Sequence, residues 1–170
     1  MDIEKEKKAI ERLKAFAPET EPYYLCYSGG KDSDCIRILA QLAGVPHEIH
    51  HNLTTADAPE TVNYIKSIPN VIIEKKYFDD GTPMTMWNLI PRKKIPPTRL
   101  IRYCCEKLKE HGGKHRVKVT GVRWAESRSR KESSGVVKII GSPKTTQKLL
   151  ESENINFRQT IGGGGIKYRQ

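Results

Sequence analysis

The stretch YYLCYSGGKDS, residues 23–33, constrains the fold more than any other part of the sequence. An apolar aromatic run ends abruptly in two glycines, a lysine and two serine hydroxyls, and apolar residues then repeat at helical spacing as far as Ala43. We therefore predict a strand, a tight loop and a helix that ends at Gly44, because glycine readily adopts the left-handed conformation of a C-cap. A unit of this kind is typical of the α/β class.

Further strands and helices alternate along the chain. Strands are predicted at 47–53, 71–77, 117–122 and 136–140, and helices at 59–68, 84–94, 99–110 and 145–151. This alternation predicts one Rossmann-like domain, with a mostly parallel five-stranded sheet and helices on both faces. We expect that domain at 23–155, after an N-terminal helix within 1–22 and before a glycine-rich tail at 156–170 that forms a flexible end or a lid.

The charge of the chain favours anionic partners. Thirty Lys and Arg against twenty Asp and Glu give a formal charge of +10, spread from Lys5 to Arg169. Such a balance suits nucleotides, nucleic acids or acidic protein surfaces, although it can also serve solubility alone. Because the first helix is charged and no apolar stretch approaches the roughly 18 residues that span a bilayer, we expect a cytoplasmic protein without a membrane partner.

The loop at 28–33 is expected at the carboxyl edge of the sheet, where α/β proteins bind ligands. Its glycines let the backbone close around an oxyanion, while unpaired amides and the helix dipole supply partial positive charge, to which Lys31 adds a full charge. Ser28 and Ser33 offer hydroxyl groups, and Asp32 can cap the helix or meet a metal or ribose. The spacing differs from a Walker A loop, since Asp32 follows the lysine. The alternative is an ordinary tight turn with an exposed lysine.

Four segments resemble known sequences. Ser28-Gly29-Gly30-Lys31-Asp32-Ser33 looks like the pyrophosphate-binding loop (PP-loop) of the adenine nucleotide α-hydrolase-like, or N-type ATP pyrophosphatase, superfamily. Pro59-Glu60-Thr61, PTRLIRYCCEKLK and TGVRWAESRSR resemble, in the same order, segments of the phosphoadenosine phosphosulfate (PAPS) reductase family. The resemblance implies a HUP-type fold, an adenosine nucleotide as ligand, either ATP with Mg²⁺ or PAPS, and a role in sulfur metabolism.

The same resemblance assigns site residues. Lys31 and Asp32 are the implied catalytic groups, and Cys104 is the thiol of this chain that we add to them as a candidate nucleophile. The implied nucleotide and phosphate ligands are Ser28, Gly29, Gly30, Lys31, Asp32, Ser33, Thr54, Arg99, Arg102, Gly121, Arg123, Glu126, Ser127, Arg128 and Arg130. Helical phase supports part of this set, because it places Arg99 and Arg102 on one face. Alternatively, Arg102 pairs with Glu106 one turn later, and the segment from Arg123 is a basic surface loop.

The chain departs from the family pattern after the second strand. Leu53-Thr54-Thr55 stands where the family usually has Asp-Thr-Gly, so the family's aspartate is absent. Asp57 is a candidate to replace this missing aspartate. Equally, Asp57 and Glu60 have the spacing of a capping box ahead of the next helix. His50 and His51 alternate along the strand, so at most one of them faces the site.

The cysteines limit the chemistry further. The four are Cys26, Cys35, Cys104 and Cys105, without a C-x-x-C pair, which favours reduced thiols and disfavours an iron–sulfur cluster or a closed zinc site with His111 and His115. The family's C-terminal Glu-Cys-Gly-Leu-His segment is also absent. Thiol reduction would then require Cys104 or Cys105 as nucleophile, with a pKa lowered by Arg99 or Arg102.

Three functions remain open to the chain. The first is a PAPS reductase-like enzyme that binds ATP or PAPS and performs adenylation by cleavage between the α- and β-phosphates, or sulfonucleotide chemistry. The second is nucleic-acid sulfur modification of the thiolation or phosphorothioation type, with nucleic acid as partner. The third is a non-catalytic nucleotide-binding module. The sequence does not identify the acceptor substrate. A homodimer is compatible with the sequence.

Overall fold

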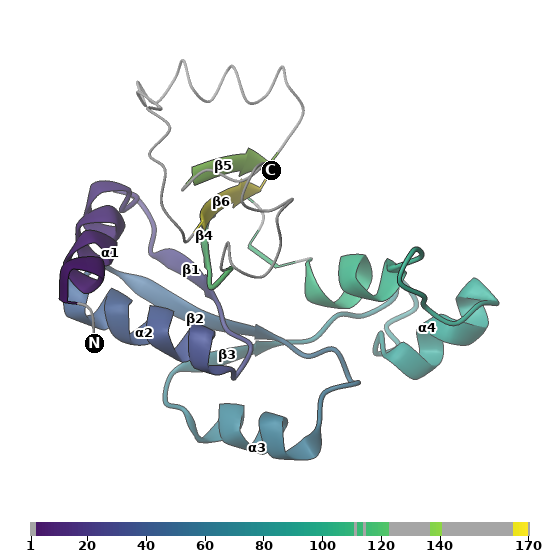
Figure 1. Cartoon of the computed structure of the whole chain (residues 1–170). Coiled ribbons are helices and arrows are strands. Elements are labelled where there is room, and N and C mark those ends of the chain that lie inside the picture. The colour runs from purple at the N-terminus through teal and green to yellow at the C-terminus, as the bar shows by residue number, and fades with distance from the viewer. Residues whose placement is uncertain (1–2, 111, 114, 123–136, 141–164, 170) are drawn as a thin grey trace. The chain divides into compact units, whose positions relative to one another are not determined.

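The computed structural model describes residues 3–110, 112–113, 115–122, 137–140 and 165–169 (Figure 1). The helices are α1 (Ile3–Ala15), α2 (Lys31–Ala43), α3 (Pro59–Ser67), α4 (Met86–Lys93) and one π-helical turn, η1 (Cys105–Lys109). The strands are β1 (Tyr23–Cys26), β2 (His47–Asn52), β3 (Val71–Glu74), β4 (Val117–Thr120), β5 (Val137–Ile140) and β6 (Gly165–Arg169). The chain divides into two compact units.

The first unit comprises Met1–Cys26, Gly30–Glu48 and Gly113–Gln170. Its strands β1 and β4 run parallel, with Leu25 beside Val119, and α2 packs against both while α1 packs on α2 (Figure 1). As predicted, α2 ends at Gly44, whose φ of 65° lies in the left-handed region. Its buried positions face the apolar strands, so the amphipathic pattern of the sequence positions this helix on the sheet.

Within the first unit, Arg116 links the beginnings of two strands. Its guanidinium lies 2.6 Å from a carboxylate oxygen of Glu48 and donates to the carbonyl oxygen of Pro22 at 2.8 Å. The same group lies over the ring of Tyr24, 5.5 Å from the ring centre. The hydroxyl of Tyr23 donates to the carbonyl oxygen of Leu13 at 2.9 Å and so joins α1 to β1. These polar contacts hold the beginning of the sheet, at the end opposite the ligand-binding edge that the sequence predicts.

The sheet differs in part from the expected sheet, which was mostly parallel and had five strands. Its order is β3-β2-β1-β4-β6-β5, and β1 to β4 form a parallel, Rossmann-like part. Strand β6 lies antiparallel to β4 and parallel to β5, so the predicted strand at 136–140 exists but runs against the first four. The tail prediction missed β6, although Ile166 and Tyr168 alternate there with Lys167 and Arg169. The glycine run just before it concealed that short alternation.

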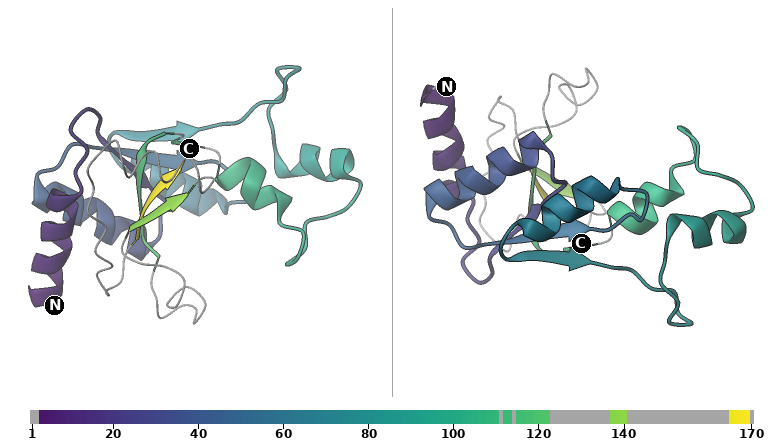
Figure 2. Two further views of the ribbon diagram at one scale, coloured as in Figure 1. Left: turned by 90° about the horizontal axis from the view of Figure 1, so that it is seen from above. Right: turned by 90° about the horizontal axis from the view of Figure 1, so that it is seen from below.

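The second unit comprises Tyr27–Gly29 and Ile49–Gly112. Strands β2 and β3 pair in parallel from Ile49 beside Val71 to Asn52 beside Glu74, and α3 lies against this pair (Figures 1 and 2). A second apolar cluster of Leu89, Tyr103 and Leu108 joins α4 to η1. Among the helices that the structure describes, none has the length and apolar character needed to cross a membrane.

Candidate functional site

The loop after β1 leads directly into α2, with Gly30 as the N-cap residue. Gly30 has an extended conformation, φ −94° and ψ 160°, and its carbonyl oxygen accepts the amide protons of Ser33 at 2.9 Å and Asp34 at 3.0 Å. Most helices place Ser, Thr, Asp or Asn here, whose side chains bind the first amides. A glycine cannot do this. The helix therefore begins without a side-chain cap from its N-cap residue, and the helix dipole adds positive potential at that point.

The two hydroxyl-bearing residues of the loop differ in position. Ser33 is buried, and its hydroxyl donates to the carbonyl oxygen of Gly30 at 2.7 Å, so this side chain closes the first helical turn. In this geometry the hydroxyl proton of Ser33 is directed to the helix backbone, and the role of Ser33 as a nucleotide ligand stays a prediction. Ser28 is exposed. Lys31 is also exposed, at the first helical position, while Asp32 is half-buried.

Two features of the structure explain why position 29 is a glycine. Its φ of +75° lies in the left-handed region, where a side chain is costly. A Cβ atom built there would lie 3.0 Å from Cδ1 of Ile65 and 3.3 Å from a methyl group of Thr61. Both neighbours belong to α3, and Ile65 is fully buried. Within the second unit, α3 thus presses against the loop and fixes the turn at Gly29.

Gly121 brings the end of β4 against the first turn of α2 within the first unit. A Cβ atom at this position would lie 3.2 Å from the carbonyl oxygen of Asp32 and 3.1 Å from Cδ1 of Ile36. The backbone after β4 therefore approaches the backbone of the candidate loop closely. Residues of the predicted arginine-rich segment, which begins two positions later, lie outside the described residues: Arg123, Glu126, Ser127, Arg128 and Arg130.

The segment after β2 forms a side-chain-closed turn. The carboxylate of Asp57 accepts both the amide proton of Thr54 at 2.9 Å and its hydroxyl proton at 2.7 Å. The predicted capping box is wrong, because Ala58 is the N-cap residue of α3 and Asp57 turns back toward the strand instead. Thr54 and Asp57 are therefore hydrogen-bonded to each other. The sequence pattern did not predict this pairing.

The arginines of PTRLIRYCCEKLK do not share a helical face. The predicted helix from Arg99 is wrong at its beginning, because residues 99–102 are not helical and the chain enters its helical turn only at Tyr103. The side chain of Thr98 accepts the amide proton of Ile101 at 3.0 Å and closes a short turn in place of a helix N-terminus. Arg99 and Arg102 are both exposed. The prediction that both arginines contact one phosphate therefore lacks the helical geometry on which it was based.

Arg102 instead contacts a thiol. One of its amino groups lies 3.4 Å from Sγ of Cys105, and this hydrogen bond raises the pKa of the Arg102 guanidinium. Its predicted alternative partner, Glu106, pairs with Lys107 at 2.9 Å. Burial raises the pKa of the neighbouring Cys104 thiol, and the proximity of Cys105 adds to that shift. A raised pKa keeps Cys104 protonated at neutral pH, which is the opposite of what a nucleophilic thiol needs.

The two histidines of β2 have separate partners. His50 places Nδ1 2.7 Å from a carboxylate oxygen of Glu74 on β3, while Nδ1 of His51 lies 3.0 Å from the carbonyl oxygen of Tyr27. The sequence analysis missed both partners. Glu74 follows three apolar residues of β3 and stands beside Asn52 in the register, so strand pairing is the signal that could have identified it.

Within the residues described, no group of three or more His, Cys, Asp or Glu side chains could hold a metal ion, and all four cysteines are free thiols. Comparisons with protein-family models, with curated proteins and with solved structures found no match to this chain. The local geometry is therefore the basis for assigning a function. Its most specific part is the glycine loop, together with the uncapped start of α2 and the close approach of Gly121.

Proposed function

We propose that the chain binds an adenosine nucleotide, ATP or PAPS, at the loop of residues 28–33, as a PAPS reductase-like protein of the N-type ATP pyrophosphatase superfamily with a HUP-type domain. One observation carries the proposal. Helix α2 follows a parallel strand, begins at Gly30, which has no side chain to cap it, carries Lys31 at its first position and lies against the backbone of Gly121. Anionic groups of nucleotides are the usual ligands of this arrangement.

The loop would stabilise the negative charge of a nucleotide's terminal phosphates. Backbone amides and the helix dipole supply partial positive charge, and the ammonium group of Lys31 adds a mobile full charge. In adenylation, a substrate oxygen attacks the α-phosphate, the bond to the bridging oxygen of the β-phosphate breaks, and pyrophosphate leaves with that charge. Mg²⁺ would enter with ATP and bind its phosphate oxygens, with Asp32 as the carboxylate in the loop.

Adenylation fits the described residues better than thiol chemistry. A sulfonucleotide reductase needs a thiolate, whereas burial raises the pKa of Cys104. Cys104 stays a catalytic candidate by sequence alone, whereas Lys31 and Asp32 lie in the loop on which the proposal rests. Arg99 and Arg102, like the five site residues between Arg123 and Arg130, remain phosphate ligands by resemblance alone.

The proposal is tested by ATP turnover and nucleotide binding. Thermal-shift titrations with ATP, AMP, PAPS and adenosine 3′,5′-bisphosphate identify the ligand, and pyrophosphate release reports adenylation. Lys31→Ala should weaken binding of the preferred nucleotide about 10- to 100-fold, because a charge-assisted hydrogen bond contributes about 1.5–3 kcal/mol. Lys7→Ala, at an exposed lysine of α1, is the matched control and should bind normally.

Two results would refute this function. Equal nucleotide affinity in Lys31→Ala and in the unchanged chain would exclude the loop as the phosphate site. Nucleotide binding without pyrophosphate release, across a panel of carboxylate, amide and nucleoside acceptors, would exclude adenylation and leave a non-catalytic binding module.

A further inference from the structure

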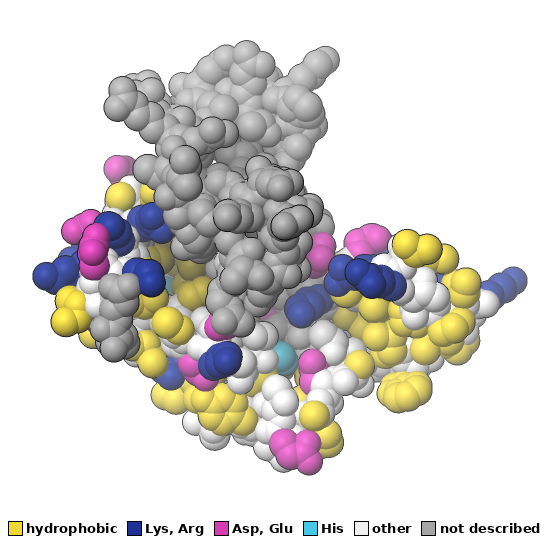
Figure 3. Space-filling model, in the orientation of Figure 1, with side chains coloured by type: hydrophobic (Ala, Val, Ile, Leu, Met, Phe, Trp, Pro, Cys, Tyr) yellow, Lys and Arg dark blue, Asp and Glu magenta, His cyan; other side chains and the backbone are white. Residues whose placement is uncertain are grey.

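Residues 81–105, all in the second unit, combine positive charge with exposed apolar side chains. This stretch contains five basic residues, Arg92, Lys93, Lys94, Arg99 and Arg102, and no Asp or Glu. Its side chains include Trp87 at 72% exposure and Leu100 at 94%. Figure 3 shows hydrophobic side chains gathered over α4 and its surroundings, with Lys and Arg side chains at the margins. Single exposed apolar residues are ordinary, but this concentration beside several cations indicates a contact surface.

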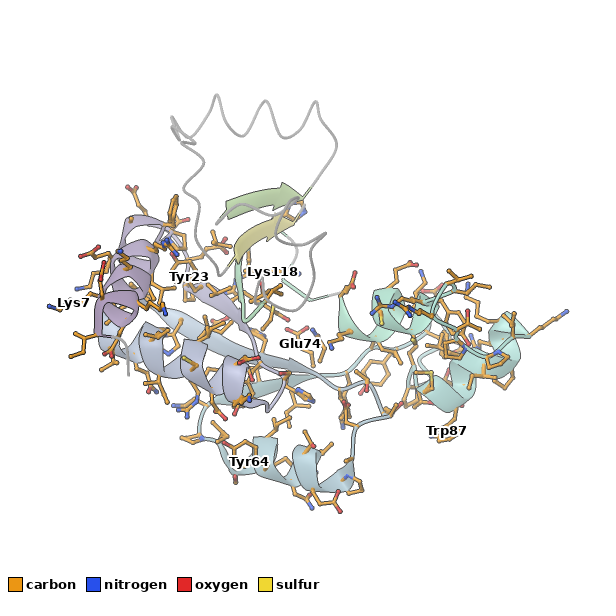
Figure 4. All side chains as sticks on the ribbon, in the orientation of Figure 1. Lys7, Tyr23, Tyr64, Glu74, Trp87 and Lys118 are labelled. Atoms are coloured by element: carbon orange, nitrogen blue, oxygen red, sulfur yellow. The ribbon has the colours of Figure 1, made fainter. Side chains whose placement is uncertain are left out.

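Helix α4 presents Trp87 on a fixed outer stripe. Trp87 and Pro91 lie one turn apart on α4 and are exposed, as is Lys94, the C-cap residue just after the helix, whereas Leu89 is buried in the cluster with Tyr103 and Leu108. Figure 4 shows Trp87 projecting away from the rest of its helix. The hydroxyl oxygen of Thr85 accepts the amide proton of Asn88 at 3.1 Å and caps the helix. The backbone that carries the indole is therefore ordered before any partner binds.

The chain after α4 is also ordered by hydrogen bonds. The hydroxyl of Tyr103 donates to the carbonyl oxygen of Ile95 at 2.7 Å. The turn at 98–101 is closed on both sides by Thr98, whose amide donates to the carbonyl oxygen of Ile101 at 3.1 Å and whose side chain accepts the amide proton of Ile101. Arg99 and Leu100 occupy the corner of this turn. The exposed side chains thus belong to a defined surface.

Three kinds of partner have the required chemistry, and the side chains discriminate among them. A membrane-surface helix needs a continuous apolar outer face, but the exposed stripe of α4 offers only one indole and a proline, and Lys94 follows directly after the helix. Protein interfaces are depleted in lysine, whereas Lys93 and Lys94 adjoin this stripe. Cations beside an accessible aromatic ring are typical of surfaces for single-stranded nucleic acid, whose bases stack while its phosphates meet the charges. Duplexes hide their base faces, so a single strand fits better.

We propose that residues 86–102 form a binding surface for single-stranded nucleic acid, with Trp87 stacking on a base and Lys93 and Lys94 contacting phosphates. Arg92 serves the fold instead, because its guanidinium pairs with Asp80 at 2.7 Å and lies 3.6 Å from the centre of the Phe78 ring. Lys94 makes no ion pair among the side chains that the structure describes, whereas Lys93 lies within electrostatic reach of Glu106, whose pKa is lowered mainly by Lys107 and to a smaller degree by Lys93. The inference rests on this surface and is independent of the nucleotide loop.

The test is fluorescence anisotropy of a labelled oligothymidylate of about 12 nucleotides, within the length range that such surfaces occupy. Trp87→Ala should weaken binding at least fivefold, because a stacked base contributes about 1–3 kcal/mol. Lys93→Ala with Lys94→Gly should weaken binding and reduce the slope of log affinity against log salt by about 1.4, for two phosphate contacts at roughly 0.7 each. Glycine suits position 94, where φ is 57°, so this variant should fold.

The matched control is Lys7→Ala with Lys14→Ala, which removes two charges from exposed positions of α1 and should leave the affinity within about twofold. Equal losses in both double variants would mean that net charge alone attracts the oligonucleotide and would overturn the proposal. It would also be overturned if Trp87→Ala bound as tightly as the unchanged chain, or if polyglutamate or anionic vesicles competed as well as the oligonucleotide did.

Discussion

The loop at 28–33 and the segment at 99–105 both carry residues assigned to phosphate binding, yet they are built in different ways. In the loop, backbone conformation is decisive: Gly29 has a positive φ and Gly30 begins a helix without a side-chain cap. In the other segment, side-chain contacts are decisive: Thr98 closes a turn and Arg102 reaches Cys105. A site formed by backbone conformation can be predicted from the positions of glycines in the sequence. A site formed by side-chain contacts cannot, because the sequence does not show which side chains meet.

The largest expected effect is at Gly29. Gly29→Ala should lower the free energy of unfolding by about 2–3 kcal/mol, through about 1 kcal/mol for the left-handed backbone and the remainder for contact with Ile65. Gly81→Ala is the matched control, because Gly81 has a φ of +79° and open space around it, so it should show the backbone cost alone. Urea denaturation measures both. Equal losses in the two variants would show that α3 does not press on the loop.

A smaller loss is expected at Asp57. Asp57→Ala removes the acceptor of two hydrogen bonds from Thr54 and should cost about 1–2 kcal/mol of stability. Asp57→Asn retains one acceptor oxygen and should lose less. The pairing would be contradicted if Glu60→Ala were equally costly, since that result would restore the capping box that the structure replaces.

The two adjacent thiols should differ in reactivity. Burial keeps Cys104 protonated, so iodoacetamide at neutral pH should modify Cys105 faster, and the modification of Cys104 should increase only as the pH rises above the usual thiol pKa. Since the folded state holds this proton more tightly than the unfolded chain, the associated stability is present below the unfolded pKa and is lost as the pH rises through the folded one. Peptide mass mapping after timed alkylation reads both sites. Faster modification of Cys104 at neutral pH would reverse the assignment.

The smallest effect concerns Asp80, an exposed carboxylate. Hydrogen bonds from Thr82 and Arg92 hold the pKa of Asp80 well below its usual range. Any stability that it contributes is therefore present above the unfolded carboxylate's pKa and is lost as the pH falls through the folded one. Asp80→Asn should produce only a slight fall in melting temperature at neutral pH, and added salt should shrink the difference further. A large, salt-independent loss would mean that the pair is part of the core of the second unit.

Sequence patterns predicted the elements that depend on local chemistry. The glycine loop, the end of α2 at Gly44 and the start of α3 at Pro59 follow from conformational preferences of single residues, and all are present in the structure. The direction of β5 and the existence of β6 were missed, because they depend on pairing with β4, far along the chain. The irregular start of the helix after Thr98 was missed because helical spacing of apolar residues does not reveal that a threonine side chain closes a turn there.

The central claim is that backbone amides at the start of α2, with Lys31, hold the anionic end of a nucleotide. Titration of the ¹⁵N-labelled protein with ATP and Mg²⁺, followed by amide chemical shifts, tests this most directly. The largest shifts should occur at Gly30, Lys31, Asp32 and Gly121, while Trp87 and its neighbours on α4 should remain unchanged. Saturable binding with no shift at Gly30 to Asp32, or with the largest shifts on α4, would contradict the claim.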